Sequence, residues 1–515
     1  MRPALALAAA LPLALGACKV DVEGAPCGAP GTTGDCPSGQ ACGNDGRCSE
    51  RAAACTASRC TPGETRCAGV DAKERAETCT DADPACGAWS ATGCTAQGLE
   101  CGTRSGAATC ECPAFSGAEL AADPIAGSIS GASPFPTGAA APAGCRFRRL
   151  GDALASAGAL AASGPVTVRA YATPAQALVV FGDVATGDGP IAIPPGVTVA
   201  GAAGATTLLR FEAATAAPLV ALEGQLGAFR IEAVAATGPA VLAGCGSSGA
   251  PALADVAVDG GGALTTGVEV SGTCGAQLSG VTVARVAGPA LRVDADPAAQ
   301  VTIQGGALRD SDVGARIAGG KVTFGVDGDP TRSVEVTGNA HEGVLLSPGA
   351  TIDARLYGAR IHGNAGTGLV VEPVTASAVS LLACDVFSNG GGAPRGYGPG
   401  GGRSVGGVLV AQNGISLALW GNRVYANAAD QLAFESSAAW SIAPSACGAA
   451  SNLFACVATG SYAVAVAGGG TVDAANTVWP AVPFASYVSA GVTAAPTSYC
   501  NTLAGVPATP ACPVP

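Results

Sequence analysis

Short strands of alternating apolar and polar residues recur through the second half of the chain, and an asparagine follows each of them. These asparagines are Asn339, Asn364, Asn389 and Asn427. The next apolar strand opens four residues after each asparagine, except after Asn389, where fourteen additional residues intervene. Without those fourteen residues the asparagines are spaced by 25, 25 and 24 residues. A constant period of about 25 residues predicts a solenoid in which each repeat forms one coil.

The alternation also predicts which side chains of each coil face the core. An aliphatic residue stands three positions before each asparagine, in the order Val336, Ile361, Val386 and Val424, and these positions should point inward. The residues four and two positions before each asparagine should then point outward. They are Glu335, Arg360, Asp385 and Arg423 in one column, and Thr337, His362, Phe387 and Tyr425 in the other.

The asparagines themselves are interpreted as structural. Asparagine tolerates left-handed backbone geometry, and identical side chains stacked ~4.8 Å apart can form hydrogen bonds from coil to coil. Asp310 stands four residues before Gly314 and fits the same rule. We therefore predict a ladder of hydrogen-bonded side chains with Asp310 at its head.

The two outward columns form the candidate glycan-binding surface. Charges of alternating sign lie beside aromatic and imidazole rings, an arrangement typical of surfaces that bind extended carbohydrate. Neighbouring opposite charges and stacked rings would also stabilise an exposed sheet without binding anything, which is the commoner reason for such a pattern. The sequence leaves both interpretations open.

The interruption of the repeat lies in the glycine-rich segment 390–406. This segment lacks the Gly-Lys-Ser/Thr signature of a phosphate-binding loop and the acidic residues of a glycine-rich calcium repeat. We expect it to form a flap over the neighbouring strands, whose outward residues Leu345, Val370 and Leu409 make an apolar strip. Structural cover is favoured over a substrate lid.

Upstream of the repeats, residues 113–144 are rich in Pro, Gly, Ala and Ser without periodicity, which predicts a flexible linker. An amphipathic helix is expected next. Its apolar face would carry Leu150, Leu154, Ala157, Leu160 and Ala161. Short Val- and Ile-rich strands bounded by Gly or Pro follow in 166–172 and 190–204.

This succession of a capping helix and two such strands resembles the opening of right-handed parallel β-helix repeat proteins of the pectate-lyase-like group. The resemblance continues to about residue 479, where 468–479 looks like a closing coil, and covers about two thirds of the chain. It implies an all-β parallel β-helix over residues 145–487, with about 12 coils and a length of about 60 Å at ~4.8 Å per coil. Such a fold alone specifies no function.

The composition narrows the range of partners. Charged residues make up only 12% of the chain, and the formal net charge is −12. Binding of nucleic acid requires clustered Lys and Arg, and the sequence has no basic stripe. We therefore expect no nucleic-acid partner.

The N-terminus has the layout of a secretory signal over residues 1–17, with one Arg and an apolar run too short to span a bilayer. Leu15-Gly16-Ala17-Cys18 resembles the bacterial lipobox, which implies cleavage before Cys18 and lipidation of that residue. An ordinary signal peptide followed by a chance cysteine is the alternative. Lys19, in place of the aspartate that favours retention in the inner membrane, implies an outer-membrane anchor.

Cysteines predict disulfide-stapled modules over residues 18–112, because thirteen of the 22 lie between Cys27 and Cys112. Residues 36–48 resemble the short EGF-like or knottin-like modules of bacterial surface proteins, and residues 60–67 with the cysteines after them resemble a second Cys-rich module of secreted bacterial proteins. It lacks the paired CxxC motifs of an all-cysteine zinc site, and no metal is expected.

Cys145 follows the linker and could complete the pairing of these thirteen. Seven more cysteines lie beyond it, and six of them are candidates for local disulfides. The candidate pairs are Cys245 with Cys274, Cys447 with Cys456, and Cys500 with Cys512, the last within a C-terminal tail over 488–515. The seventh, Cys384, stands at an inward strand position, so we predict a free, buried and unreactive thiol.

No catalytic residue and no cofactor can be assigned. His341 and His362 are the only histidines, neither accompanies a nucleophile motif, and the nearest approach to an acidic cluster is 309–312. We expect a non-catalytic lipoprotein at the outer membrane or cell surface that serves adhesion, envelope structure, or binding of an extracellular polysaccharide or another envelope protein. A polysaccharide lyase or glycoside hydrolase is the alternative, because paired carboxylates from different coils are not visible in sequence.

Overall fold

The computed structural model describes parts of 36–112 and then residues 119–130, 145–244, 249–273, 275–347, 351–372, 377–479 and 487–493. The chain divides into two compact units, Met1–Ala114 and Phe115–Pro515. Within the described ranges, no helix is both long enough and apolar enough to cross a membrane.

The N-terminal unit consists of short antiparallel strands held by disulfides. The strands are β1 (Gln40–Cys42), β2 (Cys48–Glu50), β3 (Thr65–Ala68), β4 (Arg75–Thr80), β5 (Ala88–Gly93), β6 (Glu100–Arg104) and β7 (Ala107–Glu111). Strands β3, β4 and β5 form one sheet, while β1 pairs with β2 and β6 with β7. Disulfides join Cys36 to Cys48, Cys67 to Cys101, and Cys94 to Cys110. The prediction of a disulfide-rich N-terminal region is confirmed.

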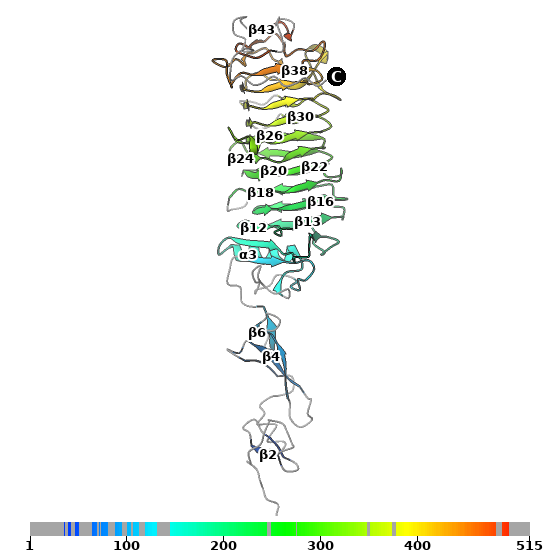
Figure 1. Ribbon diagram of the computed structural model, residues 1–515, viewed down its shortest axis with the longest axis vertical. Helices are drawn as coiled ribbons and strands as arrows, with labels where there is room; N and C mark the ends of the chain where they lie inside the picture. The colour runs from blue at the N-terminus through cyan, green and yellow to red at the C-terminus, as the bar shows by residue number, and fades with distance from the viewer. Residues whose placement is uncertain are drawn as a thin grey trace, which may run out of the picture. The chain divides into compact units, whose positions relative to one another are not determined.

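The C-terminal unit is a parallel β-helix whose strands stack coil upon coil, as predicted (Figure 1). One side is an eleven-stranded sheet, here called sheet I. Its strands are β10 (Leu178–Gly182), β13 (Thr206–Phe211), β16 (Phe229–Ala233), β19 (Ala257–Asp259), β22 (Thr282–Ala284), β25 (Ala307–Arg309), β27 (Glu335–Thr337), β30 (Arg360–His362), β33 (Asp385–Phe387), β37 (Arg423–Tyr425) and β40 (Leu453–Ala455).

The other two sides, sheets II and III, are joined into one network because β26 (Val313–Phe324) runs through both. Sheet II also contains β8 (Glu119–Ala122), β9 (Val166–Ala170), β12 (Val197–Ala200), β15 (Gln225–Gly227), β18 (Ala252–Ala254), β21 (Ala276–Ser279), β24 (Gln300–Gln304), β29 (Ile352–Tyr357), β32 (Ala378–Leu382) and β36 (Ser416–Trp420). Sheet III also contains β11 (Ile191–Ile193), β14 (Val220–Leu222), β17 (Pro239–Ala243), β20 (Thr266–Gly272), β23 (Pro289–Ala295), β28 (Val344–Leu346), β31 (Leu369–Val371), β34 (Arg395–Tyr397), β35 (Arg403–Val410), β38 (Asp430–Glu435) and β41 (Val464–Ala467). Each coil passes from sheet II to sheet I and then to sheet III.

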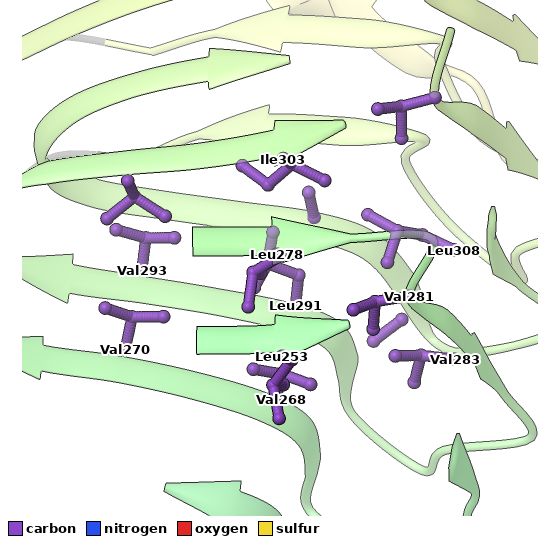
Figure 2. Close-up of a cluster of buried hydrophobic side chains, with 14 of the residues drawn as sticks. Leu253, Val268, Val270, Leu278, Val281, Val283, Leu291, Val293, Ile303 and Leu308 are labelled. Atoms are coloured by element: carbon purple, nitrogen blue, oxygen red, sulfur yellow. The ribbon is translucent and has the colours of Figure 1, made fainter. Parts of the chain in front are cut away.

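The interior of the β-helix is filled by aliphatic columns that follow the predicted alternation. In the coils around residues 253–308, the inward side chains of all three sheets meet in one continuous core (Figure 2). The column of Val336, Ile361, Val386 and Val424 is at most 4% exposed. Because each coil contacts its neighbours above and below, the apolar surface of each is buried only within the stack.

The first coils are capped by helix α3 (Leu150–Ala161), as the sequence predicts. Leu150 and Leu154 are buried against the core, and Leu160 packs at its edge. Asp188 supplies the N-terminal cap from a distant loop, because its carboxylate accepts hydrogen bonds from the backbone N–H groups of Leu150 and Gly151 at 3.2 and 2.9 Å.

Two predicted boundaries are wrong. Residues 119–122, assigned to the linker 113–144, form β8, which pairs in parallel with β9 and buries Leu120 completely. The segment contains no β-branched residue, so composition alone gave no strand signal. At the other end, β43 (Val492–Thr493) pairs with β42 (Thr471–Asp473), which in turn pairs with β39 (Ala439–Ser441), so the stack extends beyond residue 487.

Cys384 is a free and fully buried cysteine, as predicted. Burial raises the pKa of its thiol to about 12. We expect iodoacetamide at pH 8 to leave Cys384 unmodified in the native protein and to alkylate it in guanidinium, because only the thiolate is reactive. Peptide mass mapping of both samples measures this, and native alkylation of Cys384 would contradict it.

Most predicted disulfide partners lie outside the described residues. This applies to Cys245, Cys274, Cys500 and Cys512, and also to the lipidation site Cys18. Cys447 and Cys456 are both disulfide-bonded.

Candidate functional site

The four asparagines form the predicted hydrogen-bonded ladder along one turn of the β-helix. Each Nδ2 donates to the Oδ1 of the next asparagine, at 2.7 Å from Asn339 to Asn364, 2.8 Å to Asn389 and 3.0 Å to Asn427. The Asn427 amide donates to Gln431 Oε1 at 2.6 Å and closes the row. All four asparagines are at most 1% exposed. Their polar atoms are thus occupied by one another, which leaves no group for a ligand.

Asp310 is not part of this ladder. Strand pairing aligns Arg309 with Thr337, so Ser311 lies beside Asn339, and its backbone N–H donates to Asn339 Oδ1 at 3.1 Å. Ser311 and Asn339 are 28 residues apart. Counting back from Gly314 in this longer coil misplaced the head of the ladder by one residue.

The left-handed residue of each turn is the one before the asparagine, in contrast to the prediction. Asp310 has a φ of 52° and is exposed, and the equivalent residues Gly338, Gly363, Ser388 and Ala426 have φ values of 67°, 63°, 54° and 55°. Aspartate adopts this conformation more readily than most residues. The asparagines serve only as hydrogen-bonding groups.

A second ladder, which sequence reasoning missed, runs parallel to the first. Asn422 Nδ2 donates to Asn452 Oδ1 at 3.0 Å, and Asn422 Oδ1 accepts from the backbone N–H of Cys384. Asn422 stands five residues before Asn427, at the position that Val334, Ala359 and Cys384 occupy in the preceding coils. A polar residue in this otherwise apolar column was the available signal.

Three rings of the predicted outward surface stack on one another over sheet I. The ring centroids of His362 and Phe387 are 4.5 Å apart with planes 11° from parallel, and those of Phe387 and Tyr425 are 5.0 Å apart at 4°. Both faces of Phe387 are therefore covered by neighbouring rings. The stack presents ring edges to solvent, so it supports the sheet and offers no central platform for a sugar.

The charged column beside these rings is only partly self-paired. Arg423 Nε and Nη2 donate to the two carboxylate oxygens of Asp385, and this bonding raises the pKa of Arg423. Glu335 Oε1 lies 2.9 Å from His362 Nε2 but 4.0 Å from Arg360 Nη1. The Arg360 side chain is 52% exposed, which makes it the charged group of the column with most freedom to bind a ligand.

A groove of about 320 Å³ follows the corner where sheet II turns into sheet I. Its polar lining includes Asp327, Asp329, Tyr357, Arg360, Asp385 and Arg423, and Leu382 lies among them. The groove joins three residues of the predicted surface to four that were not predicted. Asp327 and Asp329 come from the loop after β26, whereas Tyr357 and Leu382 end strands β29 and β32 of sheet II. Contact among the four depends on the stacking of separate coils.

One end of the groove is shaped by the loop at residues 326–333. Asp329 begins the short helix η4 (Pro330–Arg332), and its carboxylate accepts hydrogen bonds from the backbone N–H and hydroxyl of Thr331 at 3.0 and 2.6 Å. These bonds lower the pKa of Asp329. The carboxyl therefore stays ionised, whereas a general acid for glycoside hydrolysis requires a raised pKa.

The insertion at 390–406 lies on a different side of the molecule, over sheet III. Its strand β34 pairs antiparallel with β35, and Tyr397 packs on the strip that includes Val370 and Leu409. Tyr397, Val370 and Leu409 are at most 3% exposed. The insertion is a structural cover, which was the favoured expectation.

Ion pairs hold this hairpin at both of its strands. Arg395 Nε lies 2.6 Å from Glu342 Oε1, and Arg395 Nη2 lies 3.0 Å from Glu372 Oε1. Arg403 Nη2 binds the buried Asp430 at 2.9 Å, and the Tyr397 hydroxyl donates to the same carboxylate.

Among the residues that the structure describes, no group of three or more His, Cys, Asp or Glu is placed to hold a metal ion. His341 Nδ1 lies 2.6 Å from Asp312 Oδ1, but this exposed pair is separate from the corner groove.

Two solved structures similar to the chain are A-modules of mannuronan C-5 epimerases from Azotobacter vinelandii. The AlgE6 module is 14% identical with a TM-score of 0.26, covering 67% of this chain and 94% of its own. The AlgE4 module is 14% identical with a TM-score of 0.30, covering 66% of this chain and 94% of its own. No protein-family model and no curated protein matches the chain. At such identity the similarity concerns the fold alone, and no activity is carried over from it.

Proposed function

We propose that the β-helix binds an extracellular polysaccharide, without catalysis, in the groove at the corner of sheets I and II. The observation that carries this proposal is the groove itself, which runs past four successive coils and keeps Arg360 and Asp327 exposed within it. A groove along the stacking axis suits an extended chain with many hydroxyl groups, because carboxylate and guanidinium groups can accept from and donate to hydroxyls.

The charges favour a neutral polysaccharide over a strongly acidic one. The charges of Asp385 and Arg423 neutralise each other. The charge of Asp329 is offset by Arg332, whose Nε lies 3.5 Å from Asp329 Oδ2. The exposed Asp327 and Arg360 have opposite charges. A polyanion would thus meet no net positive field in the groove, and the chain as a whole carries −12.

The absence of catalysis is proposed from the roles that the groove's carboxylates already have. Asp385 is bound by Arg423, and Asp329 is held ionised by Thr331. We further propose that the protein is a lipoprotein of the cell envelope, anchored through Cys18, with the disulfide-rich region between its anchor and the β-helix.

The double variant Arg360→Ala/Asp327→Ala is expected to weaken polysaccharide binding by about tenfold or more, because hydrogen bonds to charged groups each contribute about 1.5–3 kcal/mol. Retention of the intact protein on an array of neutral and acidic polysaccharides measures the effect. Both side chains are exposed, so the melting temperature should stay within about 2 °C of the wild type.

Arg292→Ala is the matched control, since Arg292 is likewise an exposed arginine near a carboxylate, that of Asp294, and lies on sheet III outside the groove. Undiminished retention of the double variant would remove this groove from consideration. Release of new sugar ends from the bound polysaccharide would overturn the non-catalytic part of the proposal.

A further inference from the structure

Trp420 is exposed at the end of β36, although an indole ring in water leaves a large apolar surface unburied. Its exposed fraction is 49%, and it is the one aromatic residue among the exposed large hydrophobic side chains of the described residues. The chain has only four tryptophans. Trp440 and Trp479 stack on Phe434 and Phe454, with centroids 5.7 and 5.5 Å apart.

Single exposed apolar residues are common and carry no meaning alone. Trp420, however, continues the corner groove. Strand pairing places it beside Leu382, and Leu382 beside Tyr357, and both of these line the groove. Three residues after Trp420 the chain reaches Arg423, another lining residue. The indole therefore stands one coil beyond Leu382, at the end of the groove remote from the loop at 326–333.

The faces of the Trp420 ring are free of other rings and cations within the described part of the chain, where the ring stacks and cation–π contacts involve other residues. This distinguishes Trp420 from Phe387, whose two faces are covered by His362 and Tyr425. Trp420 thus supplies the flat apolar surface that the ring stack of sheet I does not.

We infer that Trp420 is a platform on which one sugar ring of the bound polysaccharide stacks, and this inference rests on the proposed function of the groove. An indole face packs against the C–H groups on one face of a pyranose ring. When the hydroxyls are equatorial, as in glucose-type units, such C–H groups are accessible on both faces of the ring, whereas an axial hydroxyl blocks one of the two faces. The structure therefore assigns the ligand to neutral polysaccharides of glucose-type pyranose units.

The same geometry sets the axis along which the polysaccharide lies. From the loop at 326–333 past Tyr357 and Leu382 to Trp420 the groove crosses three coil steps, about 14 Å at ~4.8 Å each, which is room for roughly three sugar rings. The polysaccharide lies along the stacking axis, with hydroxyls at Asp327 and Arg360 and an apolar ring face on Trp420.

Affinity electrophoresis of the full chain in gels containing laminarin, xyloglucan or yeast mannan tests the inference. Laminarin and xyloglucan have glucose-type backbones, whereas the mannose units of mannan carry an axial hydroxyl. We expect retardation by at least one of the two glucans, a loss of about tenfold or more in affinity for Trp420→Ala, and a smaller loss for Trp420→Phe, which keeps an aromatic face. Val234→Ala is the control, because Val234 is 54% exposed and is not among the residues that line the groove.

Tryptophan fluorescence supplies a second readout, since glucan binding should shift the emission to the blue in the wild type and not in Trp420→Phe.

If Trp420→Ala binds as tightly as the wild type while Arg360→Ala/Asp327→Ala does not, the platform is wrong and the groove proposal stands. If the wild type binds none of the three polysaccharides, both are wrong. Equal retardation by mannan would overturn the glucose-type assignment. Concentration-dependent sedimentation that Trp420→Ala abolishes would identify the indole as a contact between two copies and overturn the platform.

Discussion

Asn364→Ala is expected to lower the free energy of unfolding by about 3–5 kcal/mol, because each buried polar group left without a partner costs about 1–3 kcal/mol. Asn364 Oδ1 accepts from the backbone N–H and the Nδ2 of Asn339, and Asn364 Nδ2 donates to Val336 O and Asn389 Oδ1. Alanine removes all four bonds at a site that is 1% exposed. Asn339 in the preceding coil and Asn389 in the following coil each lose a hydrogen-bond partner at the same time.

The measurement is urea unfolding followed by circular dichroism, with the shift in midpoint compared among variants. Asn413→Ala is the matched control, because the exposed Asn413 side chain also forms hydrogen bonds, at 3.1 Å to Ser437 and to the backbone of Ala438, and accepts one from the Ser436 hydroxyl. The expected loss is about 1 kcal/mol, because water replaces the exposed bonds and the Ser436 hydroxyl still accepts from the Ala438 backbone N–H and the Trp440 indole. An unchanged midpoint for Asn364→Ala would show that the ladder does not stabilise the fold.

Asp430→Ala is expected to release the hairpin over sheet III and to lower the free energy of unfolding by about 2–4 kcal/mol. The Asp430 carboxylate is 1% exposed and binds the Arg403 guanidinium, the Tyr397 hydroxyl and the backbone N–H of Tyr462, the last at 2.6 Å. Without it, a buried hydroxyl and a half-buried cation lose their shared partner. Burial together with Asp430 raises the pKa of the Tyr397 hydroxyl, so it remains a donor throughout the neutral range.

Limited trypsin digestion distinguishes release of the hairpin from global unfolding, because Arg395 and Arg403 lie within the insertion. We expect cleavage after these residues in Asp430→Ala at temperatures where the remaining β-helix is still folded. Tyr397→Phe keeps the ring on the apolar strip and removes the hydroxyl, which donates to Asp430 and accepts from Arg403 Nε. It leaves the ion pair between Asp430 and Arg403 in place, so its hairpin should stay more resistant than that of Asp430→Ala. Equal resistance of wild type and Asp430→Ala would show that apolar packing alone holds the insertion.

The coil period and the inward columns were predictable because they depend on local alternation. Val336, Ile361 and Val386 recur at the same distance from their asparagines, and no knowledge of the rest of the chain was needed to place them inside. Where the coil length changed, counting residues back from the next strand gave the wrong ladder position, as the one-residue error at Asp310 shows. Residues 119–122 were missed for a different reason, because their strand is specified by pairing with β9 and not by its own composition.

The candidate site was only partly predictable. Arg360, Asp385 and Arg423 followed from the repeat, whereas Asp327 lies in a corner loop and Tyr357 and Leu382 end strands of sheet II, where no asparagine marks the register. These residues come together only when the strands of sheet II stack in the observed order, and that order is a property of the whole β-helix. Trp420 had no distinguishing motif, and its significance lies in its exposure, which sequence does not give.

The insertion over sheet III also bears on how the chain avoids misassembly. Coils of similar length and composition can slip past one another by a full repeat at little cost in apolar burial. The hairpin removes that degeneracy, because Arg395 and Arg403 reach their carboxylates only when Glu342, Glu372 and Asp430 are supplied by the correct coils. In a stack shifted by one repeat, the guanidinium groups of Arg395 and Arg403 would lie over an apolar strip without a carboxylate partner. A single irregular coil therefore gives an otherwise repetitive chain one alignment of lowest energy.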